Sequence, residues 1–322
     1  GYLLGDVHDG IRQMFKIIEY ARMMVGTKAI STLSTGYLNA LSYAKSRVQG
    51  PDLTKQLDKA SPRVTIIHHP DVRRSLLTQK AYAEGMRALV LYTASIQDSI
   101  MLEKDEAKLK ELEKLNDLLL PIVKGYGSEK SWVQLGTESL QTFGGSGFTQ
   151  DWPLEQYVRD AKIDTLYEGT TAIQGLDFFF RKIVRDNGAT LMSLGAEIKA
   201  FCESGGALAD EKAKLLKALG DCEGIISTMI GYALASQSKP EEIYKVGLNT
   251  TRALFAAGDV IISWLLLRMA EIAASKPADD FYTGKIAAAK HFVNVVLPHL
   301  TAERKIAEAT DGSIMEIPEK AF

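Results

Sequence analysis

Residues 141–174, QTFGGSGFTQDWPLEQYVRDAKIDTLYEGTTAIQ, interrupt a chain whose other segments show long apolar periodicity. The pattern breaks at 144–147, GGSG, and again at 167–171, YEGTT. Between the breaks we expect one short helix, because Pro153 suits a first turn and Glu155 complements the positive end of the helix dipole. The stretch therefore predicts two turns around a short helix, with longer helices on either side.

The second turn runs into the start of the next helix. Either Thr170 or Thr171 can cap that helix, because a threonine hydroxyl accepts a hydrogen bond from an unpaired N–H of the first turn. This leaves Glu168 and Gly169 in the connection. A single carboxylate in such a turn is most often an exposed residue, so its position alone assigns Glu168 no function.

The rest of the chain reads as helices. Apolar residues recur at three- and four-residue steps from 11 to 48, which predicts one long amphipathic helix, or two nearly collinear ones, ending at Gly50-Pro51. Residues 50–70 show no clear period and are expected to connect this helix to the next. Further helices of the first half are expected from Asp71, from within the charged run 104–114, which is expected to be a solvated turn and helix start, and from Ser128. Four more are expected near 189–203, 207–237, 240–275 and 279–310.

Composition excludes several classes of function. The net charge is −2, and no block of lysine and arginine accumulates that could neutralise several phosphates, so we expect no nucleic-acid partner. The most apolar run, Val260 to Leu267, is too short to span a bilayer, so we expect no membrane insertion. Cys202 and Cys222 are isolated thiols without metal-ligand spacing to histidine, which predicts no metal site and a reduced, cytoplasmic location.

Three sequence words within 141–174 point to a family. Q-x-F-G-G-x-G-F, V-R-D-A-K-I and Y-E-G-T-x-x-I-Q, in this order and spacing, closely resemble the acyl-CoA dehydrogenase family. The resemblance implies α,β-desaturation of an acyl-CoA thioester, with FAD as hydride acceptor. Such a reaction needs a base facing the α-carbon in a dry pocket, where burial raises a carboxylate pKa toward a useful value.

The resemblance assigns roles to individual residues of the stretch. It makes Glu168 the catalytic base, with its own backbone N–H in the oxyanion site, and Gly169 a substrate contact. It places Thr170 and Thr171 on the flavin, whereas Ala172 stands where some members carry a polar residue and receives no role. The residues implied to contact the flavin of a neighbouring subunit are Gln141, Gly144 and Gly145.

The long first helix carries further matches. The segment containing Glu19 and Arg22 resembles one that contacts the CoA ester, and Arg47 resembles a residue that reaches the flavin diphosphate of the partner subunit. Some relatives place the base on this helix instead. Glu19 is the only carboxylate at that position here, so it is the rival of Glu168.

The resemblance also predicts the domain organisation. We expect an all-α chain in which residues 9–185 form an antiparallel helical bundle and 186–322 an accessory helical bundle, as in the long-type members. Residues 1–8 are expected to be the tail of a preceding β-domain, with a remnant strand in 1–5. The chain then reads as the C-terminal part of a longer homodimeric enzyme with an electron-transfer flavoprotein as electron acceptor.

Two other functions remain compatible with these residues. An acyl-CoA oxidase uses the same base and flavin but passes electrons to oxygen, and peroxide formation distinguishes it. A non-enzymatic relative that keeps the bundle as a binding module has little reason to retain Glu168 in its Y-E-G-T setting.

Overall fold

The computed structural model describes all residues from 1 to 322 and is almost entirely helical. The chain forms two compact units, one of residues 1–94 and 119–170 and the other of residues 95–118 and 171–322. Each unit has buried apolar residues of its own. These limits cut through two long helices, whereas the predicted domains meet at 185/186.

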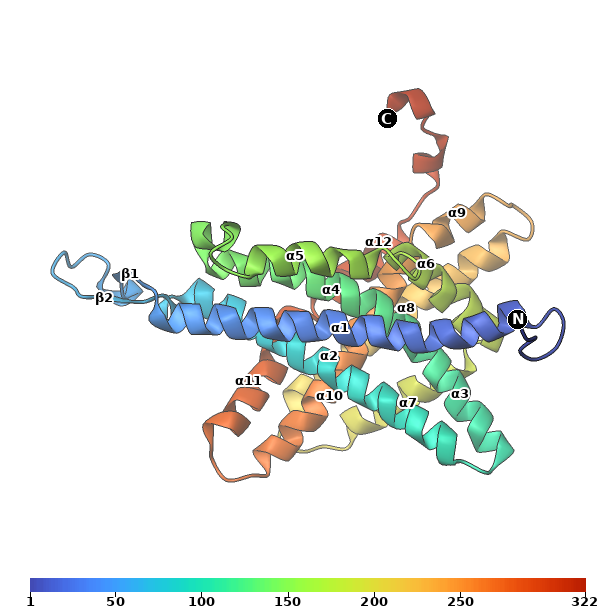
Figure 1. Cartoon of the computed structure of the whole chain (residues 1–322), viewed down its shortest axis with the longest axis horizontal. Coiled ribbons are helices and arrows are strands. Elements are labelled where there is room, and N and C mark those ends of the chain that lie inside the picture. The colour runs from blue at the N-terminus through green and yellow to red at the C-terminus, as the bar shows by residue number, and fades with distance from the viewer. The chain divides into compact units, whose positions relative to one another are not determined.

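The first unit is built along helix α1, Gly10–Ser46, shown in blue in Figure 1. Its buried face carries Val25, Ala29, Ile30, Leu33, Ala40 and Ala44. Their three- and four-residue spacing is the predicted apolar stripe, and it packs against α4. The other helices that contribute to this unit are α2 (Pro70–Leu102), the end of α3 (Glu106–Pro121), α4 (Gly127–Gln134) and α5 (Leu154–Lys162).

The end of α1 and the connection after it differ from the prediction. The helix ends at Ser46, before Gly50-Pro51, because the chain turns extended to form strand β1, Val48–Pro51. This strand pairs antiparallel with β2, Arg63–Thr65. The predicted connection 50–70 therefore contains most of a small two-stranded sheet, whose short strands lack a readable alternation.

The remnant strand predicted in residues 1–5 is not formed. Residues 1–4 have no regular structure, and the side chains of Tyr2, Leu3 and Leu4 are exposed. A strand requires a neighbouring strand to pair its N–H and C=O groups. The only sheet of this structure consists of β1 and β2, which pair with each other.

Ser128 does not open a helix, contrary to the prediction. A π-helical segment, Ile122–Tyr126 (η3), joins α3 to α4, and a second one, Leu135–Leu140 (η4), follows α4. The first is marked by the Gly127 N–H, which donates to the Ile122 carbonyl. The helix thus continues through Pro121 and Gly125, although proline and glycine are poor helix formers, because wider turns redistribute the hydrogen bonds.

The second unit contains the C-terminal helices. Its elements are α6 (Thr171–Leu176), the π-helix η7 (Asp177–Ile183), α7 (Ala189–Glu203), α8 (Ala209–Ala235), α9 (Glu242–Gly247), α10 (Thr250–Ala274), α11 (Asp280–Val295) and α12 (His299–Glu308). The predicted helix 189–203 is confirmed. The helix predicted at 240–275 is divided at Leu248-Asn249 into α9 and α10. The helix predicted at 279–310 is divided at 296–298 into α11 and α12.

Helix α10 forms the centre of this unit. Every residue from Ala256 to Leu267 is buried, and α8 and α11 pack against the helix. The segment Glu242–Ala274 has the length and composition of a membrane span, but 83% of its most apolar window is buried inside the structure, as in a core helix. Trp264 is buried in this helix.

The close approach of α1 to the π-helix η3 yields a first prediction. A Cβ atom on Gly26 would lie 2.5 Å from the Val123 carbonyl oxygen and 2.9 Å from its carbon. We expect Gly26→Ala to lower the free energy of unfolding by about 1–3 kcal/mol, because backbone must move to make room. Urea unfolding followed by circular dichroism measures the change.

The matched control is Gly136→Ala in the same unit. A Cβ there meets only the Val158 side chain, at 4.0 Å, which is ordinary contact. Equal destabilisation by both substitutions would show that the α1 contact has no special tightness.

Candidate functional site

The turn that contains Glu168 has an unusual backbone conformation. Glu168 has φ of 57° and Gly169 has φ of 89°, so two successive residues lie at positive φ. This region is uncommon for a residue with a side chain and costs of order 1–3 kcal/mol, so the surrounding structure must hold it. Both residues are half-buried, and Thr170, directly before α6, is exposed. The glutamate is therefore fixed in the turn ahead of a helix, as the sequence predicts.

Lys124 lies next to this turn and was missed by the sequence analysis. Its side chain is fully buried in the π-helix η3, and its Nζ donates to the Gly169 carbonyl oxygen at 2.5 Å. Burial lowers the pKa of Lys124 to about 8, and the charge of Arg22 acts in the same direction, whereas Asp164 and Glu168 oppose it. The sequence feature that could have identified Lys124 is a single lysine inside the apolar run 118–127, LLLPIVKGYG.

A buried ion pair supports the segment just before the turn. Asp164 is fully buried, and Lys28 of α1 donates to both of its carboxylate oxygens at 2.9 Å. The hydroxyl of Tyr167 also donates to Asp164, at 3.4 Å. Burial and the Asp164 charge both raise the pKa of Tyr167, so this hydroxyl stays protonated and remains a donor.

The Gly-rich turn is held at the other end of α1. The Tyr43 ring stacks on Phe143 with centroids 4.3 Å apart, and Trp152 packs edge-on against Tyr43 at 5.4 Å. The Tyr43 hydroxyl also donates to the Ser146 Oγ, at 3.5 Å. Arg47 follows this last turn of α1, and its N–H donates to the Tyr43 carbonyl at 2.8 Å.

The predicted residues thus fall into two groups along α1. The first, the Glu168 turn, consists of Glu168, Gly169 and Thr170 and lies beside Lys124. The second, the Gly-rich group, consists of Arg47, Gln141, Gly144 and Gly145. Arg22, whose charge reaches Lys124, is separated from the end of α1 at Ser46 by roughly 36 Å at 1.5 Å per residue.

The two remaining predicted residues, Glu19 and Thr171, lie on different helices. Glu19 lies one turn before Arg22 on α1, is half-buried and accepts a hydrogen bond from Lys16 at 3.3 Å. Thr171 is the first residue of α6 and is half-buried.

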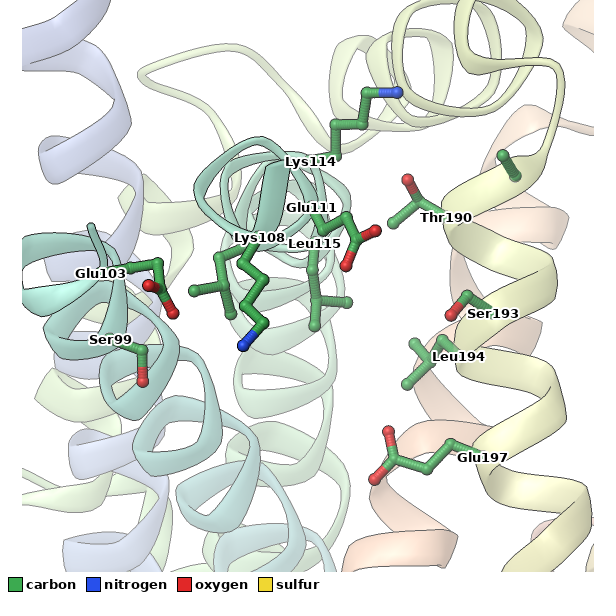
Figure 2. A pocket seen from close by; sticks show the side chains of 12 residues that line it. Ser99, Glu103, Lys108, Glu111, Lys114, Leu115, Thr190, Ser193, Leu194 and Glu197 are labelled. Atoms are coloured by element: carbon green, nitrogen blue, oxygen red, sulfur yellow. The ribbon is translucent and has the colours of Figure 1, made fainter. Parts of the chain in front are cut away.

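A cavity of about 750 Å³ lies elsewhere, within the second unit. Figure 2 shows Glu103 and Lys108 on one side of it and Ser193 and Glu197 on the other. Its charges are of both signs, and Lys114 on its rim is paired with Asp186 at 2.8 Å. No predicted site residue lines this cavity, so we keep the candidate site at the Glu168 turn and the Gly-rich group.

Sequence comparison identifies the family. The model of the acyl-CoA dehydrogenase C-terminal domain matches residues 8–178, and a model described as acetyl-CoA dehydrogenase C-terminal like matches residues 194–318. The chain belongs to the acyl-CoA dehydrogenase family, whose members are FAD-dependent oxidoreductases.

Individual relatives cover the whole chain. It is 58% identical over 335 residues to the broad-specificity linear acyl-CoA dehydrogenase FadE5 of Mycobacterium tuberculosis, and 34% identical over 337 residues to a butyryl-CoA dehydrogenase of Syntrophomonas wolfei. Each alignment includes 100% of this chain and 54% of the relative, so the chain spans about half the length of these curated relatives.

The fold is shared with solved structures. An acyl-CoA dehydrogenase from Bacillus anthracis, complexed with FAD, superposes with a TM-score of 0.72 at 18% identity. The superposition covers 98% of this chain and 53% of the other. This likeness confirms the predicted helical fold.

The Lys28–Asp164 pair yields a second prediction. We expect Lys28→Met to lower the free energy of unfolding by about 2 kcal/mol, because it leaves a charged carboxylate in the interior. The value is below that of a fully enclosed pair, since 46% of the Lys28 side chain is exposed. Thermal and urea unfolding of the variant measure it.

Lys16→Met on the same helix is the control, because Lys16 is 71% exposed and pairs with Glu19 at the surface. We expect a change below about 1 kcal/mol there. If the two variants were equally stable, the buried pair would contribute nothing beyond a surface pair.

Proposed function

We propose that this chain is the C-terminal, helical part of a flavin-dependent acyl-CoA dehydrogenase that desaturates an acyl-CoA thioester between its α and β carbons. The observation that carries the proposal is the Glu168 turn: a glutamate held at positive φ, directly before a helix, within the residues that match the family's C-terminal domain. A surface turn has no need for a carboxylate in this strained conformation.

In this proposal Glu168 takes the α-proton. Glu168 lies in a half-buried turn. In this proposal its own backbone N–H donates to the thioester oxygen as negative charge develops there. Gly169 has no side chain, so the thioester can approach the backbone closely. The base and the donor thus come from one turn, and its rigidity sets their relative position.

The residues present fit FAD. The Gly-rich group offers the guanidinium of Arg47, the amide of Gln141 and backbone N–H groups, and nothing lies within 4 Å of where a Cβ of Gly144 or Gly145 would be. Arg47 is exposed, and the nearest carboxylate in sequence to Gln141, Glu138, is already paired with Arg74. An open, donor-rich turn without an unpaired carboxylate suits a diphosphate.

FAD, when bound, supplies the hydride acceptor for the β-carbon. Thr170 and Thr171 would hold the flavin of their own subunit. Arg47 and the Gly-rich turn would hold that of a neighbour, because they lie at the far end of α1 from Lys124 and the Glu168 turn. This separation supports a two-fold homodimer, in which each end of α1 serves a different cofactor.

The remaining partners follow from the same reaction. Reduced flavin must pass its electrons on, and we propose an electron-transfer flavoprotein as the acceptor and the cytoplasm as the location. The location is supported by the two free thiols, Cys202 and Cys222, because disulfides are rare in the reducing cytosol.

Substitution of Glu168 tests the proposed base. In the full-length holoprotein, we expect Glu168→Gln to keep its FAD content but to slow flavin bleaching by acyl-CoA about 10²- to 10⁴-fold, because the amide cannot accept the α-proton. Stopped-flow absorbance on mixing with acyl-CoA measures the rate.

Glu19→Gln is the matched control, since Glu19 is the rival base on α1. We expect it to bleach at nearly the wild-type rate. Normal bleaching by the Glu168 variant with loss in the Glu19 variant would reverse the assignment. Peroxide production by the wild type in air would instead indicate an acyl-CoA oxidase with the same base.

Mixed dimers test the sharing of the site between subunits. Arg47→Ala and Glu168→Gln are each expected to be inactive alone. Co-expressed in equal amounts, they should recover about a quarter of the wild-type sites, because only a heterodimer pairs an intact Glu168 with the partner's intact Arg47. Turnover per flavin measures the recovery, and its absence would place Arg47 on the cofactor of its own subunit.

A further inference from the structure

Lys124 is a buried charge that the proposed reaction does not use directly. An ammonium group removed from water costs several kcal/mol unless its surroundings compensate for it. Its side chain has no exposed surface, and residues 119–128 around it are all buried. A methionine or leucine would fill this space more cheaply, so the lysine calls for an explanation other than packing.

The contact that Lys124 makes is directed at the Glu168 turn. Its Nζ donates to the Gly169 carbonyl oxygen across 45 positions of sequence. That carbonyl belongs to the second of the two residues held at positive φ. A charge-assisted hydrogen bond to the turn backbone therefore opposes relaxation of this strained conformation.

The local helix geometry brings Lys124 to this position. It is the middle residue of the five-residue π-helix η3, Ile122–Tyr126. Each residue of an α-helix advances by about 100°, so the extra residue of a wide turn rotates the side chains on its two sides relative to each other. Wide turns of this kind are frequent at functional sites.

A second buried lysine shows what a purely structural role looks like. Lys212 in α8 donates to the Gly205 carbonyl and to the Ser204 hydroxyl, and it forms an ion pair with Glu271. Its turn contains no glutamate at positive φ. Lys124 differs because its carbonyl partner directly follows the proposed base.

We propose that Lys124 is a positioning residue for Glu168, which acts through the Gly169 carbonyl to hold the turn in the conformation that presents the carboxylate to the substrate. This inference rests on the proposed function, since it requires Glu168 to be the base. It predicts that the protonated lysine holds the turn better than the neutral one.

The charged groups around Lys124 come from α1, from α4 and from residues 164–168. Arg22 of α1 destabilises the ammonium, whereas Asp164, Glu168 and Glu129 of α4 stabilise it. Burial is the largest effect, and the pKa of Lys124 falls to about 8. The ammonium is therefore present below about pH 8, and the neutral amine above it.

This titration affects rate and stability in opposite directions. The rate of flavin bleaching should fall as pH rises through about 8, because the charge-assisted bond to Gly169 is lost. The folding stability contributed by Lys124 should instead rise between about pH 8 and its unfolded value of 10.5, because there the unfolded state binds more protons. A merely structural lysine has no reason to separate the two.

Lys124→Met in the full-length holoprotein is the first test. We expect normal FAD content and KM within about threefold, but a bleaching rate at pH 7 lower by about 10- to 100-fold, as for a slightly misplaced catalytic group. The fall in rate near pH 8 should disappear. Lys130→Met in the adjacent helix, where Lys130 lies over the rings of Tyr82 and Tyr126, is the control and should keep the wild-type pH profile.

Lys124→Gln is the second variant, because it keeps an N–H donor without charge. We expect a rate between those of wild type and Lys124→Met and no titration near pH 8. A Lys124→Met enzyme with the wild-type rate and pH profile would overturn the inference. If Lys124→Met does not fold, a wild-type rate and profile in Lys124→Gln would do so.

Glu168→Gln in the same assay separates the two proposals. If that variant bleaches normally, the assignment of the base is wrong and the role of Lys124 falls with it. If it is inactive while Lys124→Met behaves as wild type, the base stands and only the positioning role is wrong.

Discussion

The contact between α1 and the π-helix η3 is the constraint on which the first unit depends. At Gly26 the two backbones approach so closely that a methyl group would not fit beside the Val123 carbonyl. This approach fixes the side chains that follow on both elements, Lys28 on α1 and Lys124 on η3. Lys28 reaches Asp164 and Lys124 reaches Gly169, so the two lysines hold both ends of residues 164–169, the segment that contains Glu168.

The helices themselves were readable from the sequence. The apolar stripe that starts at residue 11 predicted α1, which begins at Gly10 in the structure. The helix predicted at residues 189–203 is α7, with the predicted limits. Two predicted helices are each divided in the structure, because individual residues interrupt the helix without changing the apolar periodicity. The Asn249 side chain donates to the Lys245 carbonyl at 2.8 Å and competes with the helix, and Pro298 cannot continue the helix before it.

The candidate site was only partly readable. Glu168 and the Gly-rich turn were found because their neighbours form recognisable words, whereas Lys124 lies in a segment whose only local feature is a charge among apolar residues. Its role depends on a π-helix, which leaves no periodic signature, and on a carbonyl that returns from residue 169. A long-range contact to a backbone atom does not depend on the type of side chain at that position, so the sequence does not predict it.

The long sequence separation within the Lys28–Asp164 pair has a consequence for how the protein is made. The two residues are 136 positions apart, so at about 5–20 residues per second Lys28 is synthesised roughly 7 to 27 s before its partner. Helix α4, which packs against α1, is complete before Asp164 is made, so the apolar face of α1 can be covered before Lys28 has its carboxylate. The Glu168 turn is therefore among the last parts of the first unit to become ordered on the ribosome. A nascent chain halted before residue 164 contains the Gly-rich group but not the Glu168 turn.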